Sequence, residues 1–300
     1  MLRQTHLAAA ISAALILMRP DTPGGVLMAA AGGAVGGWIC DIDCKDVVFE
    51  SETAPGMLPA AAVCCACLAL DALLGQGAVA WTLAHWGPVS LLGACLFVLG
   101  FGLGLFVSGH RGFMHSLAAA AWFTLSLGAV CRPLALPFGV GFLSHLLLDL
   151  PNKKGLRLFF PLRARFCLSW CSARGRVNTL LCLVCSLSAA GLFGFLAARS
   201  LPAGLLPSPW GPANPQAVLL WYALASVWAA AVVLADRKPR RRPKALDALL
   251  PLLCAAGGAA GAYAALALTA RRTRLRRWQL LCPLLTAAHV FALTLLLRPV

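Results

Sequence analysis

Residues 89–108, VSLLGACLFVLGFGLGLFVS, decide the fold because these twenty consecutive residues carry no charged side chain. A helix of roughly 20 apolar residues covers the hydrocarbon thickness of a bilayer, about 30 Å. Backbone amides in lipid must find their hydrogen bonds within their own segment. This run therefore predicts a membrane-spanning helix and not a strand.

Runs of the same kind recur along the rest of the chain, separated by charges or turn residues. They predict helices at about 7–18, 26–39, 57–74, 89–108, 116–131, 134–150, 177–198, 217–235, 246–269 and 279–297. The composition agrees, since 60% of the residues are hydrophobic and only 12% are charged, about half the charged share of a soluble domain. We predict an all-α fold: a polytopic integral membrane protein, built as a helical bundle of roughly eight to ten apolar helices.

Some of these runs also predict local structure. The first two are short for membrane spans and predict a helical hairpin that turns at residues 20–25, PDTPGG. Gly32-Gly33 and Gly36-Gly37 in the second run permit close helix packing. The run at 246–269 has basic sequence on both sides and contains Gly257-Gly258. It predicts either a re-entrant pair of half-helices or one plain span.

The formal net charge of +15 raises the question of a nucleic-acid partner. The cations gather in short runs beside apolar segments, as expected for loops on the cytoplasmic side of a membrane. Residues 153–176 and 236–244 are such runs, and residues 199–216 between them, rich in proline and with one charge, suit the opposite side. A nucleic-acid-binding protein needs a soluble basic face, so we expect membrane lipid and not nucleic acid as a partner.

Other polar or reactive residues within apolar sequence give weaker signals. The thirteen cysteines mostly lie in apolar runs, and their spacing predicts neither a disulfide framework nor a cysteine metal site. Asp71 is either functional or the mark of a helix end. His289, alone in the last apolar run, predicts an interhelical hydrogen bond.

Four polar motifs interrupt the apolar pattern in the first half of the chain. They are Thr5-His6, residues 38–46 (WICDIDCKD), residues 109–116 (GHRGFMHS) and residues 144–149 (SHLLLD). Counting helix by helix from the cytoplasmic loop at 153–176 places all four at the cytoplasmic face. Because ionisable residues are rare in membrane segments, their gathering at one face predicts a shared polar site.

The residue types in these motifs are those that bind divalent metals. The candidate ligands are His6, Asp41, Asp43, His110, His115, His145 and Asp149. His145 and Asp149, spaced i and i+4, lie on one helix face, so an imidazole and a carboxylate can reach one ion. Neutral imidazole with carboxylate suits Zn, Mn, Fe or a similar divalent ion, and the candidates are numerous enough for two ions.

Two residues beside these ligands are candidates for catalytic roles. Arg111, next to His110, predicts a clamp for an anionic group. Ser116 is either the N-cap of the following helix or a nucleophile, although no nucleophile-elbow pattern surrounds it. A metal site of this kind activates water and stabilises charge on a phosphoryl or acyl oxygen.

In this order, the four motifs resemble those of the YdjM-like family of LexA-regulated, inner-membrane metal-dependent hydrolases. The family pattern is Gly/Thr-His, Leu-Pro-Asp-Ile-Asp, Gly-His-Arg-Gly-Phe-Thr-His-Ser and Ser-His-x-x-x-Asp, followed by Gly-x-x-Leu-x-x-Pro, here residues 155–161. The chain departs from this pattern at Ile39-Cys40, Met114 and Asn152, none of which is a candidate ligand. The resemblance implies a multi-pass protein of the bacterial inner membrane that uses a divalent metal for hydrolysis.

The C-terminal third resembles a second, small membrane family of unknown function. The resemblance rests on an apolar helix ending at residues 236–238, on the Gly257-Gly258 pair and on the basic run at 271–274. We therefore expect a fusion of two membrane domains. Residues 1–198 would form the YdjM-like hydrolase domain, residues 199–216 a Pro-rich linker, and residues 217–300 the small domain.

The predicted function is a membrane-bound metal-dependent hydrolase with a cytoplasm-facing site. Its substrate would be a phosphoester or acyl ester of a small molecule or a lipid. One alternative is a transporter or a stress-linked membrane partner that binds an ion or a proton at the cluster. Transporters usually hold such sites near the midplane between repeats, so motifs at helix ends favour the enzyme. Another alternative is a purely structural metal site with closed coordination.

Overall fold

The computed structural model describes residues 3–43, 54–108, 111–153, 155–172, 175–201, 215–235, 250–268 and 276–297. Within these residues the chain is helical, and extended segments pair only at two isolated bridges, Asn152 with Cys171 and Leu156 with Phe166. The chain divides into two compact units, residues 1–178 and 179–300. The predicted all-α class is confirmed.

Several of the described helices are long and apolar enough to cross a membrane. They are Pro88–Phe106, Arg176–Ser200 and Leu250–Ala267, and the bent pair of Ala60–Leu73 with Ala78–Ala84 adds a fourth if it forms one span. The two helices of this pair meet at an angle of 80°. Shorter apolar helices accompany them, at Pro23–Ile39, Leu117–Val130, Val218–Leu234 and Leu281–Leu295.

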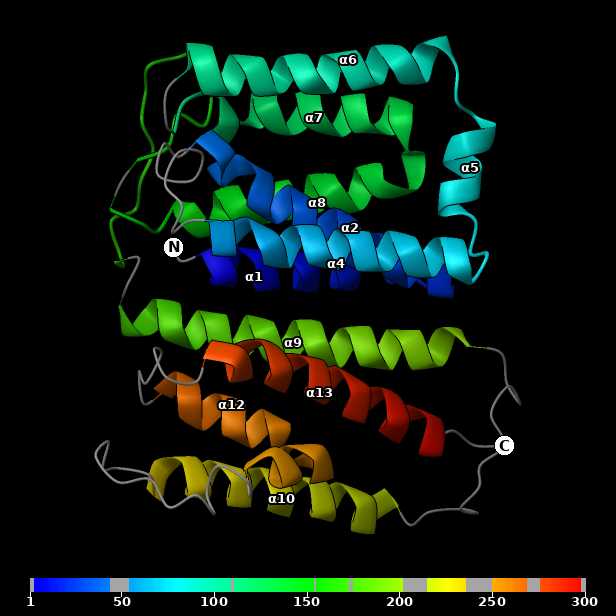
Figure 1. Cartoon of the computed structure of the whole chain (residues 1–300). Coiled ribbons are helices and arrows are strands. Elements are labelled where there is room, and N and C mark those ends of the chain that lie inside the picture. Colours follow the sequence, from blue (N-terminus) through cyan, green and yellow to red (C-terminus); the bar gives the residue numbers. More distant parts are fainter. Residues whose placement is uncertain are drawn as a thin grey trace. The chain divides into compact units, whose positions relative to one another are not determined.

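The first unit is a bundle in which α2 is central. Its helices are α1 (Arg3–Met18), α2 (Pro23–Ile39), α4 (Ala54–Leu73), α5 (Ala78–Ala84), α6 (Pro88–Gly102), α7 (Leu117–Val130) and α8 (Arg132–Asp149). α2 packs against α1, α4 and α8, while α7 lies between α6 and α8 (Figure 1). Three short turns, η1 (Cys40–Asp43), η2 (Leu103–Val107) and η3 (Phe113–His115), contact one another. They bring together the ends of α2 and α6 and the start of α7.

Glycines bring α2 into backbone contact with two of its neighbours. A methyl group at Gly36 would overlap the Phe138 carbonyl of α8, and one at Gly33 would lie 2.8 Å from the Ala10 carbonyl of α1. Helices in lipid associate through such close van der Waals packing, because lipid tails are as apolar as the side chains. The prediction that these glycines permit close packing is confirmed.

α1 and α2 form the predicted hairpin, but the turn between them is shorter than predicted. Pro23 already lies in the first turn of α2, and the Thr22 side chain caps this helix by accepting a hydrogen bond from the Gly25 amide at 3.1 Å. Proline suits the first helical position because no intrahelical partner is needed for its amide there. The Pro-Gly-Gly part of the predicted turn is therefore helical.

A short helix, α5, replaces part of the loop predicted between the third and fourth apolar runs. Asp71, near the end of α4, is buried, and its carboxylate accepts hydrogen bonds from the amides of Ala78 (3.3 Å) and Val79 (2.8 Å). The first amides of a helix have no partner within it, and the carboxylate supplies one. Of the two roles considered for Asp71, the structure shows the one at a helix end.

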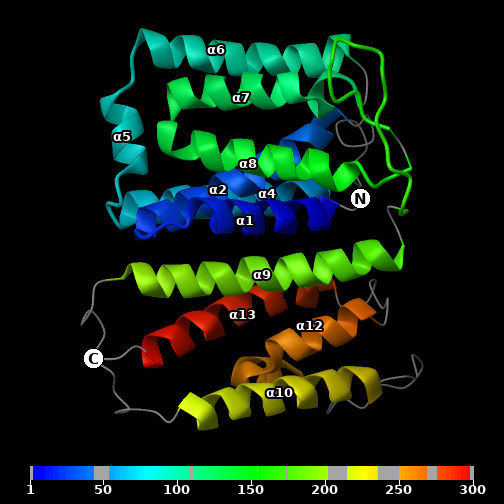
Figure 2. The ribbon, with the colours of Figure 1, turned by 180° about the vertical axis from the view of Figure 1, so that it is seen from behind.

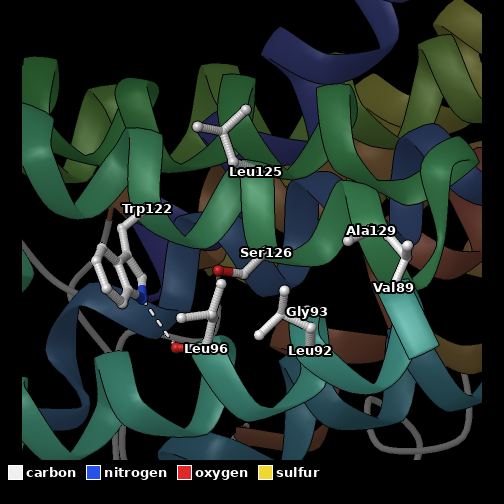
Figure 3. Close-up of a pocket in the computed structure, with 8 residues that line it drawn as sticks. All are labelled: Val89, Leu92, Gly93, Leu96, Trp122, Leu125, Ser126 and Ala129. Atoms are coloured by element: carbon white, nitrogen blue, oxygen red, sulfur yellow. Dashed lines mark hydrogen bonds between the residues drawn. The ribbon is translucent and has the colours of Figure 1, made fainter.

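An apolar groove of about 220 Å³ lies between α6 and α7 (Figure 3). Its lining residues are Val89, Leu92, Gly93, Leu96, Trp122, Leu125, Ser126 and Ala129. The Trp122 indole donates a hydrogen bond to the Leu96 carbonyl at 2.8 Å. None of the lining residues is titratable, and the groove lies along the parts of α6 and α7 remote from η3. It therefore belongs to the apolar surface of the bundle and not to a catalytic site.

The second unit contains most of α9 (Arg176–Ser200) together with α10 (Pro215–Ala235), η4 (Cys254–Gly258), α12 (Ala259–Leu268) and α13 (Arg276–Leu296). α12 packs against α10 and α13 (Figure 2). The core of this second unit consists of small and apolar side chains from α9, α10, α12 and α13.

The helix that leads into α12 is broken at Gly257, whose φ is 113°. Side chains of neighbouring helices bond three successive carbonyls at this break. They join Ala255 O to His289 Nε2 (2.8 Å), Ala256 O to Trp221 Nε1 (2.9 Å) and Gly257 O to Ser226 Oγ (3.4 Å). An unsatisfied carbonyl is costly in lipid, so these bonds stabilise the break. The predicted interhelical bond of His289 is confirmed, whereas re-entry of this segment stays a prediction.

Candidate metal centre

Five of the predicted ligands lie together at one end of the first unit. They are His6 in the first turn of α1, Asp41 in η1, His115 at the end of η3, and His145 and Asp149 in the last turns of α8. The contacts of η1 with η3, and of α8 with both α1 and α2, bring these distant parts of the sequence together. The side chains form two overlapping groups that share His145.

The first group consists of Asp41, His115 and His145. One carboxylate oxygen of Asp41, Oδ1, lies 3.6 Å from His115 Nε2 and 3.7 Å from His145 Nε2. Both histidines are fully buried, whereas the Asp41 side chain is 16% exposed. Two ring nitrogens thus point at one carboxylate oxygen from different helices.

The second group consists of His6, His145 and Asp149. His6 Nε2 lies 3.2 Å from Asp149 Oδ1, and the rings of His6 and His145 are stacked with centroids 3.9 Å apart. All three residues are buried, with exposures of 2% or less. In both groups the candidate ligand atoms lie within 4.8 Å of one another.

A backbone carbonyl of α2 orients His145. Its Nδ1 lies 2.8 Å from the Gly37 carbonyl oxygen, which accepts a hydrogen bond only if Nδ1 carries the proton. The lone pair then belongs to Nε2, the atom that faces Asp41. Histidine ligands are commonly oriented by such a bond from their second nitrogen. Since Nε2 has one lone pair, His145 can bind one ion and not two.

The arrangement fits a bound cation better than a network of hydrogen bonds. His145 Nε2 and His6 Nδ1 are buried and make no hydrogen bond with the described residues. Buried polar atoms are normally satisfied, so such atoms indicate a missing partner. Two ligands at about 2.0–2.1 Å from a tetrahedral ion lie about 3.4 Å apart. The separations of 3.6 and 3.7 Å around Asp41 Oδ1 are close to that value. These buried His/Asp groups are positioned to hold a metal ion.

Asp41 is kept in its anionic form by its surroundings. Burial by itself raises the pKa of the Asp41 carboxyl, but the nearby His145, His115 and His6 lower it by more. The net pKa therefore lies below the ordinary range of aspartate. The carboxylate is ionised at neutral pH, which is the form that binds a cation.

Arg111 fixes the second carboxylate of the site. Its Nη2 lies 3.2 Å from Asp149 Oδ2, so this carboxylate is held by His6 on one oxygen and by Arg111 on the other.

The Arg111 backbone has a φ of 63°, a left-handed conformation that is uncommon for a residue other than glycine. Strained backbone of this kind concentrates at functional sites. The Arg111 side chain is 16% exposed, so among the described site residues Arg111 and Asp41 reach the surface.

The other predicted site residues have different outcomes. His110 and the side chain of Asp43 lie outside the part of the chain that the structure describes. Ser116 is the N-cap of α7: its hydroxyl accepts a hydrogen bond from the Ala119 amide at 3.1 Å and donates one to the Phe113 carbonyl at 2.6 Å. A nucleophilic serine would give this proton to a base. The structure therefore shows the capping role of Ser116, while its catalytic role stays a prediction.

Sequence reasoning missed a residue that holds the first ligand helix in place. The Thr5 hydroxyl donates a hydrogen bond to Asn178 Oδ1 at 3.1 Å, and both residues are fully buried. Chain termini fray unless they are tied down, and this bond fixes the first turn of α1, which carries His6. The available signal was an asparagine at the start of an otherwise apolar run.

Loss of the Thr5–Asn178 bond should weaken metal binding through His6. We expect Asn178→Ala and Thr5→Val each to lower metal affinity about tenfold, the lower end of the range for residues that orient a ligand. The measurement is a competition titration with a chromophoric chelator. In a His6→Ala background, Asn178→Ala and Thr5→Val should no longer lower metal affinity. A loss of affinity caused by general destabilisation would persist in that background. Ser126→Ala, which removes a buried hydroxyl of α7 away from the site, is the matched control and should leave affinity unchanged.

The fold and the site together define a class: a polytopic helical membrane protein with a buried His/Asp group at one end of its bundle. A protein-family model described as YdjM inner membrane protein matches residues 1–240. The chain therefore belongs to the YdjM inner membrane protein family, and it is a protein of the inner membrane. No curated protein and no solved structure matches the chain. The family match extends through residues 199–216, and the predicted fusion at that segment stays a prediction.

Proposed function

We propose that this protein is a metal-dependent hydrolase whose site faces the cytoplasm. The observation that carries the proposal is the convergence of His6, Asp41, His115, His145 and Asp149 from four separate parts of the first unit. Polar residues are expensive in a membrane protein and are kept where they function. The basic run at 153–176, which follows α8 directly, supports a cytoplasmic position for this end of the bundle.

Either of the two groups would hold one divalent cation, of the Zn or Mn type, and His145, which belongs to both groups, offers a single nitrogen. When bound, such an ion supplies an activated water and stabilises charge on a phosphoryl or acyl oxygen. A second ion would need ligands from His110 or Asp43. The Gly37 carbonyl keeps His145 in the ligating tautomer, and Arg111 holds Asp149 in place. The three histidines are buried, and among the described site residues Asp41 and Arg111 are partly exposed.

The exposed side of the site favours an anionic substrate. Arg111 is a partly exposed cation at the same place as the candidate ligands, and guanidinium matches the geometry of phosphate oxygens. Of the two predicted substrate classes, phosphoesters therefore fit better than acyl esters. In hydrolysis, one water would add across the ester bond, its oxygen going to the phosphorus and its proton to the leaving alcohol.

The direct test is turnover by the purified protein in lipid nanodiscs. We expect p-nitrophenyl phosphate or bis-p-nitrophenyl phosphate to be hydrolysed faster than p-nitrophenyl acetate. EDTA should abolish the activity, and added Zn²⁺ or Mn²⁺ should restore it. Arg111→Gln should raise KM, because the guanidinium would bind the phosphoester before reaction, and should also lower metal affinity, because Arg111 holds the candidate ligand Asp149.

Two results would count against the hydrolase. Stoichiometric metal without turnover of any phosphoester or acyl ester, including those of extracted membrane lipids, would indicate a structural or ion-binding site. Turnover that survives EDTA and the His145→Ala substitution would place the activity elsewhere.

A further inference from the structure

The segment between α8 and α9, residues 151–172, has features that the proposed hydrolase site does not use. Together with the residues up to Arg176 it carries seven cations and no acidic residue. From the sequence, these charges mark only the cytoplasmic side. The structure adds where its apolar side chains point.

Backbone hydrogen bonds fold the segment on itself and also join it to the end of α8 and the start of α7. They join Leu117 N to Leu158 O (2.9 Å), Leu168 N to Leu150 O (2.8 Å), Trp170 N to Pro151 O (2.9 Å), and Leu156 with Phe166 in both directions (2.9 Å each). Leu156 is fully buried, and Leu158 and Phe160 pack against the hydrophobic core around η3. The segment is therefore a fixed part of the unit, at the end where α1 begins (Figures 1 and 2).

The outer side of the segment is both apolar and basic. Large hydrophobic side chains are exposed there: Trp170 by 78%, Leu162 by 63%, Phe159 by 48%, Leu168 by 47% and Phe166 by 41%. Arg163 and Arg165 are exposed between them in the sequence. Side chains of this kind would be unfavourable in water, but they suit the interface, where aromatic rings lie at headgroup depth and cations meet lipid phosphates.

The segment also lies beside the candidate metal centre. Leu150 and Pro151, which accept its bonds, directly follow Asp149, and Leu117 directly follows the loop that carries His115. Cations, exposed aromatics and the absence of acidic residues in 151–176 all point to the same occupant. We infer that residues 151–153 and 155–172 form a binding surface for anionic phospholipid headgroups next to the metal centre.

This surface does not depend on hydrolysis, so it can be tested separately. The full chain is reconstituted in nanodiscs that contain brominated phosphatidylglycerol or brominated phosphatidylcholine. The emission of Trp170 is obtained as the difference between the wild type and Trp170→Phe. We expect a blue-shifted Trp170 signal that brominated phosphatidylglycerol quenches more strongly than brominated phosphatidylcholine does.

Neutralising the cations tests the selectivity. Each cation near an anionic surface contributes about a fivefold preference, so Arg163→Gln with Arg165→Gln should reduce the preference for phosphatidylglycerol at least about fivefold. Arg199→Gln, an exposed arginine at the end of α9, is the matched control and should leave the preference intact. Metal content, measured in the same samples, should not change when Arg163 and Arg165 are replaced by glutamine.

Water-like Trp170 emission that neither lipid quenches would overturn the inference. Equal quenching by the two lipids, unchanged in the Arg163→Gln, Arg165→Gln double variant, would also overturn the inference. The surface would then bind lipid without regard to charge. Neither result would bear on the hydrolase proposal, whose tests are metal content and turnover.

Discussion

Replacing His145 with alanine is expected to reduce the metal content of the purified protein from a stoichiometric amount to background. His145 belongs to both candidate ligand groups, and its Nε2 faces Asp41 while its ring stacks on His6. Loss of a residue that only orients a ligand costs about 10–100-fold in affinity. Loss of His145, the ligand that both groups share, should therefore lower metal affinity at least about 100-fold. Inductively coupled plasma mass spectrometry of the desalted protein is the measurement.

Two further variants make this result specific. Asp149→Ala should give a similar loss, because its carboxylate lies 3.2 Å from His6 and is shared with Arg111. His85→Ala is the matched histidine control: His85 closes α5, and its Nδ1 bonds the Trp81 carbonyl at 2.8 Å. Metal content should be unchanged in this variant. Equal metal in the wild type and His145→Ala would remove these residues from the site.

The second large effect is expected from Gly36→Ala. The added methyl would overlap the Phe138 carbonyl, which belongs to a helix backbone and cannot rotate away as a side chain can. Overpacking of an interior costs about 1–3 kcal/mol and occasionally more. Because the clash is with the backbone of a neighbouring helix, we expect a loss of about 3 kcal/mol or more in the free energy of unfolding. α2 carries Gly37 and leads into η1 with Asp41, and α8 carries His145. Separating α2 from α8 should therefore also weaken metal binding.

The check is thermal unfolding in detergent, followed by circular dichroism, with metal affinity measured in parallel. Gly191→Ala is the control, since a methyl at this glycine of α9 would meet no atom within 4 Å. Alanine favours helix over glycine, so this control should be neutral or slightly stabilising. An unchanged unfolding temperature for Gly36→Ala would show that the α2–α8 contact is looser than described.

Much of the helical framework is predictable from the sequence because lipid imposes a simple rule on the backbone. Long uncharged runs such as residues 89–108 have to be helical, and α6 with η2 occupies that run. The glycine pairs of α2 predict close packing, because interfaces between membrane helices depend on small residues. The candidate ligands were predictable because ionisable residues are rare in membrane segments.

The parts that could not be predicted depend on contacts between distant residues. The short helix α5 exists because Asp71 binds its first amides, seven and eight residues away. The break at Gly257 is visible as a glycine pair, but the side chains that bond its carbonyls come from α10 and α13. Likewise, nothing in the spacing links Thr5 to Asn178, or shows that His145 is shared by both ligand groups.

The central claim is that histidine and aspartate side chains of the first unit bind a divalent metal. X-ray absorption at the metal edge of the purified protein tests it most directly. We expect a shell of nitrogen and oxygen with the multiple scattering of at least two imidazoles, and we expect this signal to be lost in His145→Ala. A shell dominated by sulfur at about 2.3 Å would assign the metal to cysteines, which belong to neither candidate group, and would contradict the claim.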